Sequence, residues 1–266
     1  MKYIYMLLSM LLLTACGANE QHEPQFTVHA FKVGKADSFL ISYNDEYVLI
    51  DAGEEDDGEK IVSYLQKQGI TQLAALIITH FDKDHVGGAD YIVEAVAVET
   101  IYVPDYESDS KQTAEFLQAI EGQGYKLTKL TMETAFSMQE VNGKIYPPQA
   151  LYAGDNNNSL VISLSYGETS FLFAGDIEAE RIHDMLAQSI DTYTFLKVPH
   201  HGRFNEQTAS FTKVVQPKIA LITSSDKNPE AVETVNVLEE IGADIYTTRA
   251  GHVTFSSNGT EIYVNK

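Results

Sequence analysis

The chain has 266 residues, of which 44% are hydrophobic, so it is long enough for one large domain with a buried core or for two small ones. Its 18 basic and 38 acidic side chains give a formal net charge of −20 at pH 7. This charge argues against a protein that wraps long nucleic acid or lies flat on anionic lipid, because both surfaces are themselves negative. Acidity of this size is typical of an exported protein that its own charge keeps soluble.

The N-terminal segment reads as an export signal. Residues 1–15 contain one lysine followed by an apolar run that is too short to span a bilayer, which needs about 20 apolar residues. The run ends in Leu13-Thr14-Ala15-Cys16, which resembles the bacterial lipobox, where the cysteine carries a lipid. We therefore expect a lipoprotein signal peptide in residues 1–15, a lipidated Cys16 and a flexible tether in residues 16–25. The domain that follows would lie outside the cytoplasm and touch the bacterial membrane through this lipid alone. An ordinary secretory signal with an incidental cysteine is the alternative.

Residues 26–266 alternate short β-rich runs with amphipathic helical patterns, without an internal repeat or a linker rich in proline or serine. The expected strands are 26–33, 38–43, 47–50, 73–78, 101–103, 159–166, 170–174, 195–198, 218–222, 244–247, 252–256 and 261–264. The expected helices are 58–68, 88–97, 111–121, 177–188 and one that is opened by Asn228-Pro229. Residues 131–158 show no clear periodicity. The alternation predicts one α/β domain with two sheets flanked by helices.

One loop concentrates residues that bind metals. The stretch from Thr79 to Gly88 reads THFDKDHVGG and follows a continuous apolar run that is typical of a strand buried on both faces. It places His80, Asp82, Asp84 and His85 within six residues. Imidazole and carboxylate ligands together suit zinc, manganese or iron. The sequence therefore predicts a metal site directly after the strand at 73–78.

This motif resembles the His-x-His-x-Asp-His hallmark of the metallo-β-lactamase superfamily. It is more similar still to the branch typified by the soluble domain of the DNA-uptake protein ComEC, where aspartate replaces the second histidine. Further motifs of that branch recur in order at 33–37, 49–53, 157–161, 173–176 and 197–202. The chain departs from them at Ala36, where glycine is usual, and at Arg203, where serine is usual. The resemblance implies an α/β fold, the metallo-β-lactamase αββα sandwich of two mixed β-sheets flanked by helices, over residues 26–266.

The resemblance also implies a set of ligands for one or two divalent ions, Zn²⁺ or Mn²⁺. The implied metal ligands are His80, Asp82, Asp84, His85, Asp176 and His200. His80 and Asp82 would serve a first position, Asp84 and His85 a second, and Asp176 would bridge the two. We prefer His200 to His201 as the ligand, although the reverse assignment stays open. Many members carry a further histidine near Asn157 and Asn158; its absence here leaves the first position short of nitrogen ligands.

These residues imply a metal-dependent hydrolase in which a metal-activated hydroxide attacks a phosphodiester, a nuclease-like or phosphodiesterase-like reaction at the cell surface. We expect catalytic roles for Asp84 and for His201, which could protonate the leaving oxygen. Asp37 and Asp51 would orient the ligands from behind. The expected substrate contacts are Asn157, Asn158, Ser159, Arg203 and Ser225. Because the chain is acidic, we expect a small or short phosphodiester rather than long nucleic acid.

Two other functions remain open at this point. The chain could hydrolyse a lactone, a thioester or a β-lactam, although Asp82 and the shortage of histidines disfavour a true β-lactamase. It could also be a non-catalytic surface lipoprotein that keeps the fold as a binding module. Clustered, mutually repelling carboxylates argue against an idle site. The sequence identifies no protein partner.

Overall fold

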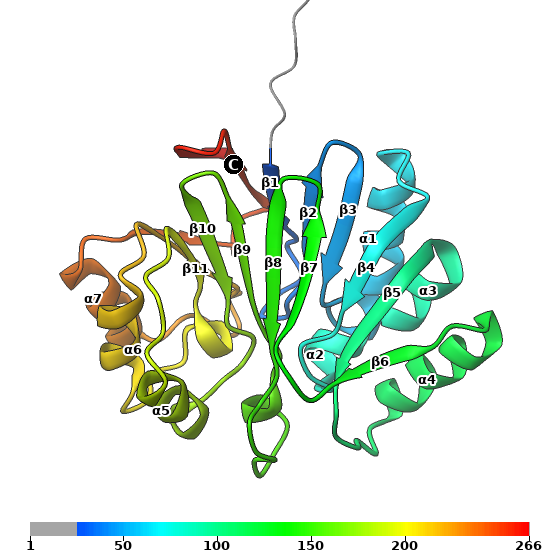
Figure 1. Cartoon of the computed structure of the whole chain (residues 1–266), viewed down its shortest axis with the longest axis horizontal. Helices are drawn as coiled ribbons and strands as arrows, with labels where there is room; N and C mark the ends of the chain where they lie inside the picture. Colours follow the sequence, from blue (N-terminus) through cyan, green and yellow to red (C-terminus); the bar gives the residue numbers. More distant parts are fainter. Residues whose placement is uncertain (1–25, 266) are drawn as a thin grey trace, which may run out of the picture.

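The computed structural model describes residues 26–265, which form two mixed β-sheets packed face to face with helices on both outer sides (Figure 1). The predicted αββα sandwich is therefore confirmed. The predicted signal peptide, Cys16 and the tether lie outside the described residues. Within residues 26–265, none of the helices combines the length and the apolar character that crossing a bilayer requires.

The first sheet has eight strands in the order β15-β14-β1-β2-β3-β4-β5-β6. Its strands are β1 (Phe26–Ala30), β2 (Phe39–Tyr43), β3 (Glu46–Ile50), β4 (Gln72–Ile77), β5 (Ala97–Pro104), β6 (Leu127–Leu130), β14 (Val253–Ser257) and β15 (Ile262–Asn265). The helices that follow its central strands are α1 (Glu55–Lys67), α2 (Lys83–Val86), α3 (Ala89–Ala95) and α4 (Lys111–Gln123). From β3 to β6 neighbouring strands run parallel, so the carboxyl ends of these strands meet at one edge of the sheet.

The second sheet has seven strands in the order β13-β12-β11-β10-β9-β8-β7. Its strands are β7 (Thr134–Met138), β8 (Val141–Tyr146), β9 (Val161–Tyr166), β10 (Thr169–Phe173), β11 (Phe195–Lys197), β12 (Ile219–Ile222) and β13 (Asp244–Thr247). The helical elements around it are η1 (Asn156–Asn158), α5 (Ala179–Ala187), η2 (Pro199–Gly202), α6 (Thr208–Val215) and α7 (Val232–Glu240). Strands β10 to β13 pair in parallel, so their carboxyl ends also meet at one edge.

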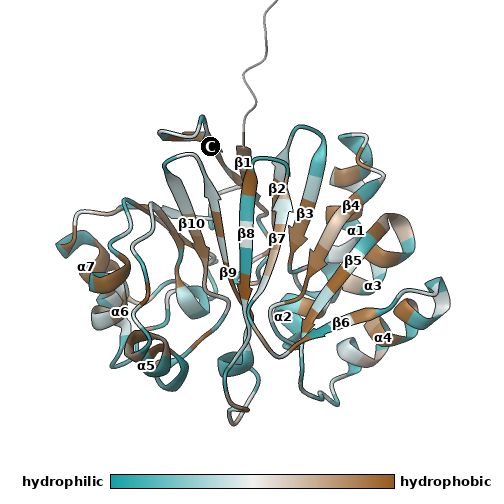
Figure 2. Ribbon diagram, viewed as in Figure 1, coloured by the Kyte–Doolittle hydropathy of each residue, from teal (hydrophilic) through white to brown (hydrophobic). Residues whose placement is uncertain are grey.

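Three apolar clusters hold the four layers together. The cluster between the sheets contains large aromatic side chains from both, among them Phe39, Phe171, Phe173, Phe195 and Phe255. A second cluster joins the first sheet to α1, α3 and α4, and a third joins the second sheet to α5, α6 and α7. Figure 2 shows the corresponding pattern, with hydrophobic residues along β3 to β5 and hydrophilic residues in the segment that links β8 to β9. Fully burying one such side chain contributes about 1.5–3 kcal/mol to stability, so the packing fixes the strand ends firmly.

The structure contains elements that were not expected, among them strand β6 of the first sheet. Residues 131–158 contain the hairpin β7–β8 and the short η1, which the sequence did not reveal. Exposed and buried positions alternate along this edge hairpin, and its exposed positions carry small or polar residues. Helix α6 was also missed, and α7 begins at Val232 instead of at Asn228-Pro229.

Candidate metal centre

The loop after β4 is held in place by close packing of its two glycines. A Cβ atom on Gly87 would lie 2.3 Å from the carbonyl oxygen of Lys83, and one on Gly88 would lie 2.5 Å from that of Ala52. A side chain at either position would therefore push the loop away from the turn that follows β3. The backbone N–H of Ala52 also donates to the carbonyl of His85 over 2.8 Å. These contacts fix the segment 80–85 at the common edge of the two sheets.

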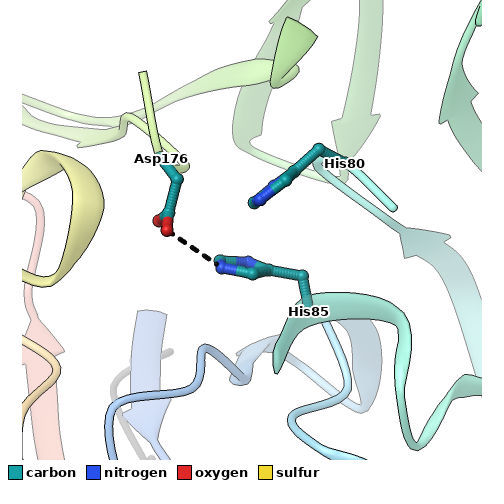
Figure 3. A group of neighbouring side chains, drawn as sticks. All are labelled: His80, His85 and Asp176. Atoms are coloured by element: carbon teal, nitrogen blue, oxygen red, sulfur yellow. Dashed lines mark ion pairs between the residues drawn. The ribbon is translucent and has the colours of Figure 1, made fainter. Parts of the chain in front are cut away.

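Side chains from both sheets converge at this edge. Figure 3 shows His80, His85 and Asp176 turned toward one another. Nε2 of His85 lies 3.3 Å from Oδ2 of Asp176, and the rings of His80 and His85 are 4.0 Å apart between centroids. Nε2 of His201 lies 2.9 Å from Oδ2 of Asp176 and 3.4 Å from Oδ2 of Asp84. Four overlapping triplets have their ligand atoms within 4.8 Å of one another; two of them are His80, His85 and Asp176, and Asp84, His85 and His201, and the other two include Asp37.

The imidazole nitrogens at the centre of this cluster have no hydrogen-bond partner. Nε2 of His80, Nε2 of His85 and Nε2 of His201 are all buried and lack a hydrogen bond of acceptable geometry. A buried polar atom without a partner costs about 1–3 kcal/mol, so native proteins rarely leave several of them together. Nitrogen lone pairs beside carboxylate oxygens are the ligands that a divalent transition metal takes. The residues present therefore fit one or two such ions.

Asp51 holds His85 from behind. At the end of β3 it adopts a left-handed backbone conformation with φ 58°. Its carboxylate accepts hydrogen bonds from the backbone N–H of Thr79 over 2.7 Å and from the Thr79 hydroxyl over 2.8 Å. Nδ1 of His85 lies 2.8 Å from Oδ2 of the same carboxylate. A carboxylate can only accept, so Nδ1 carries a proton, and Nε2 is the nitrogen that faces the cluster.

Asp37 supports His201 and Asp176 through two groups, Thr223 and Lys197, that were not singled out in the sequence. The Thr223 hydroxyl donates to Oδ1 of Asp37 over 2.7 Å, and Nδ1 of His201 lies 2.9 Å from that hydroxyl. The ammonium of Lys197, which is fully buried, forms ion pairs with Asp37 and with Oδ1 of Asp176, the latter at 3.2 Å. Lys197 begins the motif at 197–202, but no role could be assigned to it from the sequence, because its position between two distant carboxylates depends on strand packing.

The two adjacent histidines take different places, and the sequence-based preference for His200 gives way to His201. Both residues adopt left-handed backbone conformations, with φ 46° and 54°, so their rings point apart, with 70° between the ring planes. Nε2 of His200 is 4.0 Å from Oδ2 of Asp176, while its Nδ1 lies 2.9 Å from Oε1 of Glu178. His201 instead reaches the cluster, and its Nδ1 is occupied by Thr223. The role of His201 as a proton donor to substrate stays a prediction.

Two of the expected substrate contacts, Asn157 and Asn158, form hydrogen bonds mainly to the backbone of nearby loops. The Asn158 side chain accepts from the backbone N–H of Tyr152 and donates to the carbonyls of Tyr152 and Gly154. Oδ1 of Asn157 accepts from the backbone N–H of Glu178 over 2.7 Å. The Asn158 amide is therefore committed to the chain itself, whereas Asn157 also lines a hollow together with Glu178.

Of the three remaining expected substrate contacts, one lies at the cluster and two do not. The buried Ser159 hydroxyl accepts from the backbone N–H of Asp176 over 3.1 Å and lies 3.3 Å from Nδ1 of His80, so it positions two of the clustered residues. Arg203 is exposed directly after η2. Ser225 is bonded within its own turn after β12. Neither Arg203 nor Ser225 is brought into the cluster.

Two further charged side chains lie at the open side of the cluster. Lys35, whose side chain is 26% exposed, forms an ion pair with Oδ2 of Asp84. The Asp82 side chain is 44% exposed, and Oδ2 of Asp82 lies 3.6 Å from Nε2 of His80. A hollow of about 460 Å³ lies beside His200, which contacts its Glu178; it is lined by Asn157, Glu178, Ala179, Glu180, His183, Glu206 and Gln207. The hollow is therefore acidic, whereas Lys35 offers a positive charge.

Ion pairs within the cluster shift the pKa values of its carboxylates and histidines. Burial alone would raise the pKa of the Asp37 carboxyl, but the Lys197 ammonium, His201 and His85 together outweigh it and hold this pKa at about 2. Burial likewise opposes ionisation of Asp176, yet His201 and His85 hold its pKa well below the ordinary value. Burial would lower the pKa of His201, but the Asp176 carboxylate raises it to about 9. The carboxylates are thus ionised and ready for a cation.

The fold and this cluster together define a metal-dependent hydrolase fold with a candidate His/Asp metal site. Residues 32–224 match the family model of the Metallo-beta-lactamase superfamily, and the chain belongs to that superfamily. It resembles the metallo-beta-lactamase fold protein YhfI from Bacillus subtilis, with a TM-score of 0.59 and 11% identity, over 88% of this chain and 100% of that one. It also resembles Tm1679, a metal-dependent hydrolase of the beta-lactamase superfamily, with a TM-score of 0.57 and 12% identity, over 85% and 97%. At these identities the likeness concerns the fold alone.

Several curated relatives are competence or recombination proteins. The chain is 29% identical to ComE operon protein 3 of Bacillus subtilis over 64% of this chain and 22% of that protein. It is 29% identical to Recombination protein 2 of Haemophilus influenzae over 82% of this chain and 27% of that protein. The chain thus spans about a quarter of the length of these relatives. The expected kinship with the ComEC-type branch is confirmed.

Proposed function

We propose that the chain is a metal-dependent phosphodiesterase that hydrolyses small or short substrates with an activated water. One observation carries the proposal: the partnerless Nε2 atoms of His80, His85 and His201 converge on the carboxylates of Asp84 and Asp176. When bound, one or two Zn²⁺ or Mn²⁺ ions supply the Lewis acidity that makes water nucleophilic near neutral pH. His80 and Asp82 would hold a first ion, Asp84, His85 and His201 a second, and Asp176 would be shared.

The residues behind the cluster keep its geometry ready for reaction. Asp51 and the Thr223–Asp37 pair fix the tautomers of His85 and His201, so that both Nε2 lone pairs face the same space. Lys197 neutralises part of the buried negative charge without occupying Oδ2 of Asp176, because it contacts Oδ1. The site therefore requires little rearrangement when it is loaded, which is the condition for electrostatic stabilisation of a transition state.

Charge at the open side favours an anionic substrate of limited length. Lys35 is partly exposed beside Asp84 and can meet a phosphate oxygen. The hollow beside His200 carries Glu178, Glu180 and Glu206, which would repel a long polyanion laid across it. The names of the relatives refer to competence and recombination, which are processes of DNA, a phosphodiester. These observations support a phosphodiester bond as the target and a short substrate as the preferred one.

Location at the cell surface is part of the same proposal. It depends on the sequence of residues 1–16, where an export signal ends in a lipobox-like Leu13-Thr14-Ala15-Cys16. We expect the protein in the membrane fraction of its host, and we expect Cys16→Ala to release it. Detection of the Cys16→Ala variant in the membrane fraction at the level of the unchanged protein would contradict lipid anchoring.

The activity is tested by offering the purified protein three substrates with Zn²⁺ or Mn²⁺. We expect turnover of bis-p-nitrophenyl phosphate, loss of turnover with a chelator, and loss in Asp84→Ala. The control is Asp109→Asn, which removes one exposed negative charge and should retain activity. Faster hydrolysis of a β-lactam or a thioester would favour the other hydrolase classes. No turnover together with no bound metal would favour a binding module.

A further inference from the structure

A second hollow lies on the outer face of the second sheet. It holds about 450 Å³ and is lined by residues of β8, β9, β10 and α5 and of the segments that precede β7 and β11. None of its lining residues belongs to the metal-binding triplets. Much of its lining is apolar: Tyr146, Val161 and Leu172 come from three neighbouring strands, and Met185 and Ile190 come from α5 and the segment after it. A hollow of this size and lining is typical of a site for a small molecule.

The lining also contains a buried arginine. Arg181, on α5, is 2% exposed, and its Nη2 donates to the carbonyl of Pro147 over 2.8 Å. In the part of the chain that the structure describes, Nε and Nη1 of Arg181 have no hydrogen-bond partner. Burial lowers the pKa of the guanidinium, but an arginine stays protonated near neutral pH. The hollow is therefore bordered by a positive charge with two unused donor nitrogens.

Across the described residues, no carboxylate neutralises this guanidinium through an ion pair. The carboxylate of Asp184, one turn further along α5, instead accepts from the Tyr152 hydroxyl over 2.5 Å. At the rim of the hollow, Glu133 is paired with Lys144 over 2.9 Å, and Asp191 is exposed. A buried charge without a partner is destabilising, so proteins usually pair it with a charge of the opposite sign. A negatively charged ligand would supply that partner.

We propose that this hollow binds a small organic carboxylate, whose apolar body packs against Tyr146, Leu172 and Met185 and whose oxygens accept from the guanidinium of Arg181. A carboxylate has the geometry that matches the donor nitrogens of arginine. Its single negative charge balances the single buried positive charge. A phosphate monoester, with about two negative charges, would meet repulsion from Glu133 and Asp191 at the rim. The site is separate from the metal centre and goes beyond the proposed hydrolysis.

The test is a calorimetric titration of the full chain, freed of metal by a chelator, with three compounds of the same carbon skeleton. These are phenylpropanoate, the uncharged phenylpropanol and the doubly charged phenylpropyl phosphate. We expect phenylpropanoate to bind at one site, and phenylpropanol to bind at least ~10-fold more weakly, as loss of one charge-assisted hydrogen bond implies. Equal binding of phenylpropanol would show that the guanidinium does not select the ligand. Tighter binding of phenylpropyl phosphate than of phenylpropanoate would contradict the choice of a carboxylate.

Two variants test the placement of the ligand. Arg181→Met removes the charge and keeps an unbranched side chain, so it should weaken binding of phenylpropanoate by at least ~10-fold and leave binding of phenylpropanol unchanged. Met185→Trp fills the hollow and keeps the guanidinium, so it should abolish binding of both compounds, and it decides the matter if Arg181→Met does not fold. The control Lys213→Met removes an exposed positive charge from α6 and should bind as the unchanged protein does.

The outcomes separate this site from the metal centre, because every titration uses metal-free protein. No binding of phenylpropanoate to the unchanged protein, unchanged binding in folded Arg181→Met or in Met185→Trp, or an equal loss in Lys213→Met would overturn the carboxylate site. None of these results would touch the proposed hydrolysis, and an inactive metal centre would leave this site standing.

Discussion

The back and the front of the metal centre are built by opposite means. At the back, Asp37, Asp51 and Lys197 are buried, and each is held by two or more polar partners. At the front, Asp82 and Lys35 are partly exposed and make few contacts. The back is therefore rigid before any ion binds, while the front can adjust to the ion and to the substrate. The predictions below test this division.

The largest effect is expected from Lys197→Met at the back. The change leaves the buried carboxylates of Asp37 and Asp176 without their shared cation, which costs about 3–5 kcal/mol for a buried pair. Denaturant unfolding of the metal-free protein measures this loss. The control Lys60→Met removes an exposed ion pair with Asp57 and should cost less than about 1 kcal/mol. Equal losses in the two variants would contradict a rigid, charge-paired back.

In the metal-free protein, the change in the free energy of unfolding with pH should be nearly as large as the change that Lys197→Met causes. The raised pKa of His201 contributes stability that is complete below about pH 6.5 and is lost as the pH rises through about 9. The depressed pKa of Asp37 contributes stability that is present above about pH 4 and is lost as the pH falls toward 2. Between pH 6.5 and 9 the free energy of unfolding should fall by roughly 3 kcal/mol.

The metal-loaded protein is the control for this pH dependence. Bound ions replace the protons on His85 and His201, so the decline above pH 6.5 should disappear. Chemical denaturation at several pH values, with and without Zn²⁺, measures both curves. If the free energy of unfolding of the metal-free protein stays level from pH 6.5 to 9, the ion pairs of His201 do not stabilise the back of the metal centre.

A smaller effect is expected from Asp51→Asn. Asparagine tolerates the left-handed backbone at this position, so the fold should persist. It no longer offers two acceptor oxygens to Thr79 and His85, and loss of such a supporting carboxylate typically costs about 10–100-fold in metal affinity. Titration of the metal-free variant with Zn²⁺ measures the change. Affinity within twofold of the unchanged protein would argue that Asp51 does not orient His85.

The smallest effect is expected at the front, from Lys35→Ala. If Lys35 meets the phosphate, its loss should raise KM for a phosphodiester by about 3–10-fold and reduce the salt dependence of KM. KM for an uncharged thioester should not change. The control Lys32→Ala removes an exposed lysine that contacts the carbonyl of Ala250 and should leave KM unchanged. An equal change for charged and uncharged substrates would remove Lys35 from substrate binding.

The sequence predicted the parts of the molecule that local patterns determine. The apolar strand β4 and the motif that follows it specify where His80 and His85 lie, and the alternation of strands and helices specifies the layers. His200 was preferred to His201 in the sequence, with the reverse left open, because the directions of the two rings depend on two consecutive left-handed residues that no local pattern reveals. Lys197 and Thr223 were not assigned because their partners come from distant parts of the chain.

Anomalous X-ray scattering from crystals grown with Zn²⁺ or Mn²⁺ tests the central claim most directly. We predict a peak bounded by Nε2 of His85, Nε2 of His201, Asp84 and Oδ2 of Asp176, and a second peak beside His80 and Asp82. Crystals that contain either metal but show no peak at this edge of the sandwich would contradict a hydrolytic metal centre in this protein.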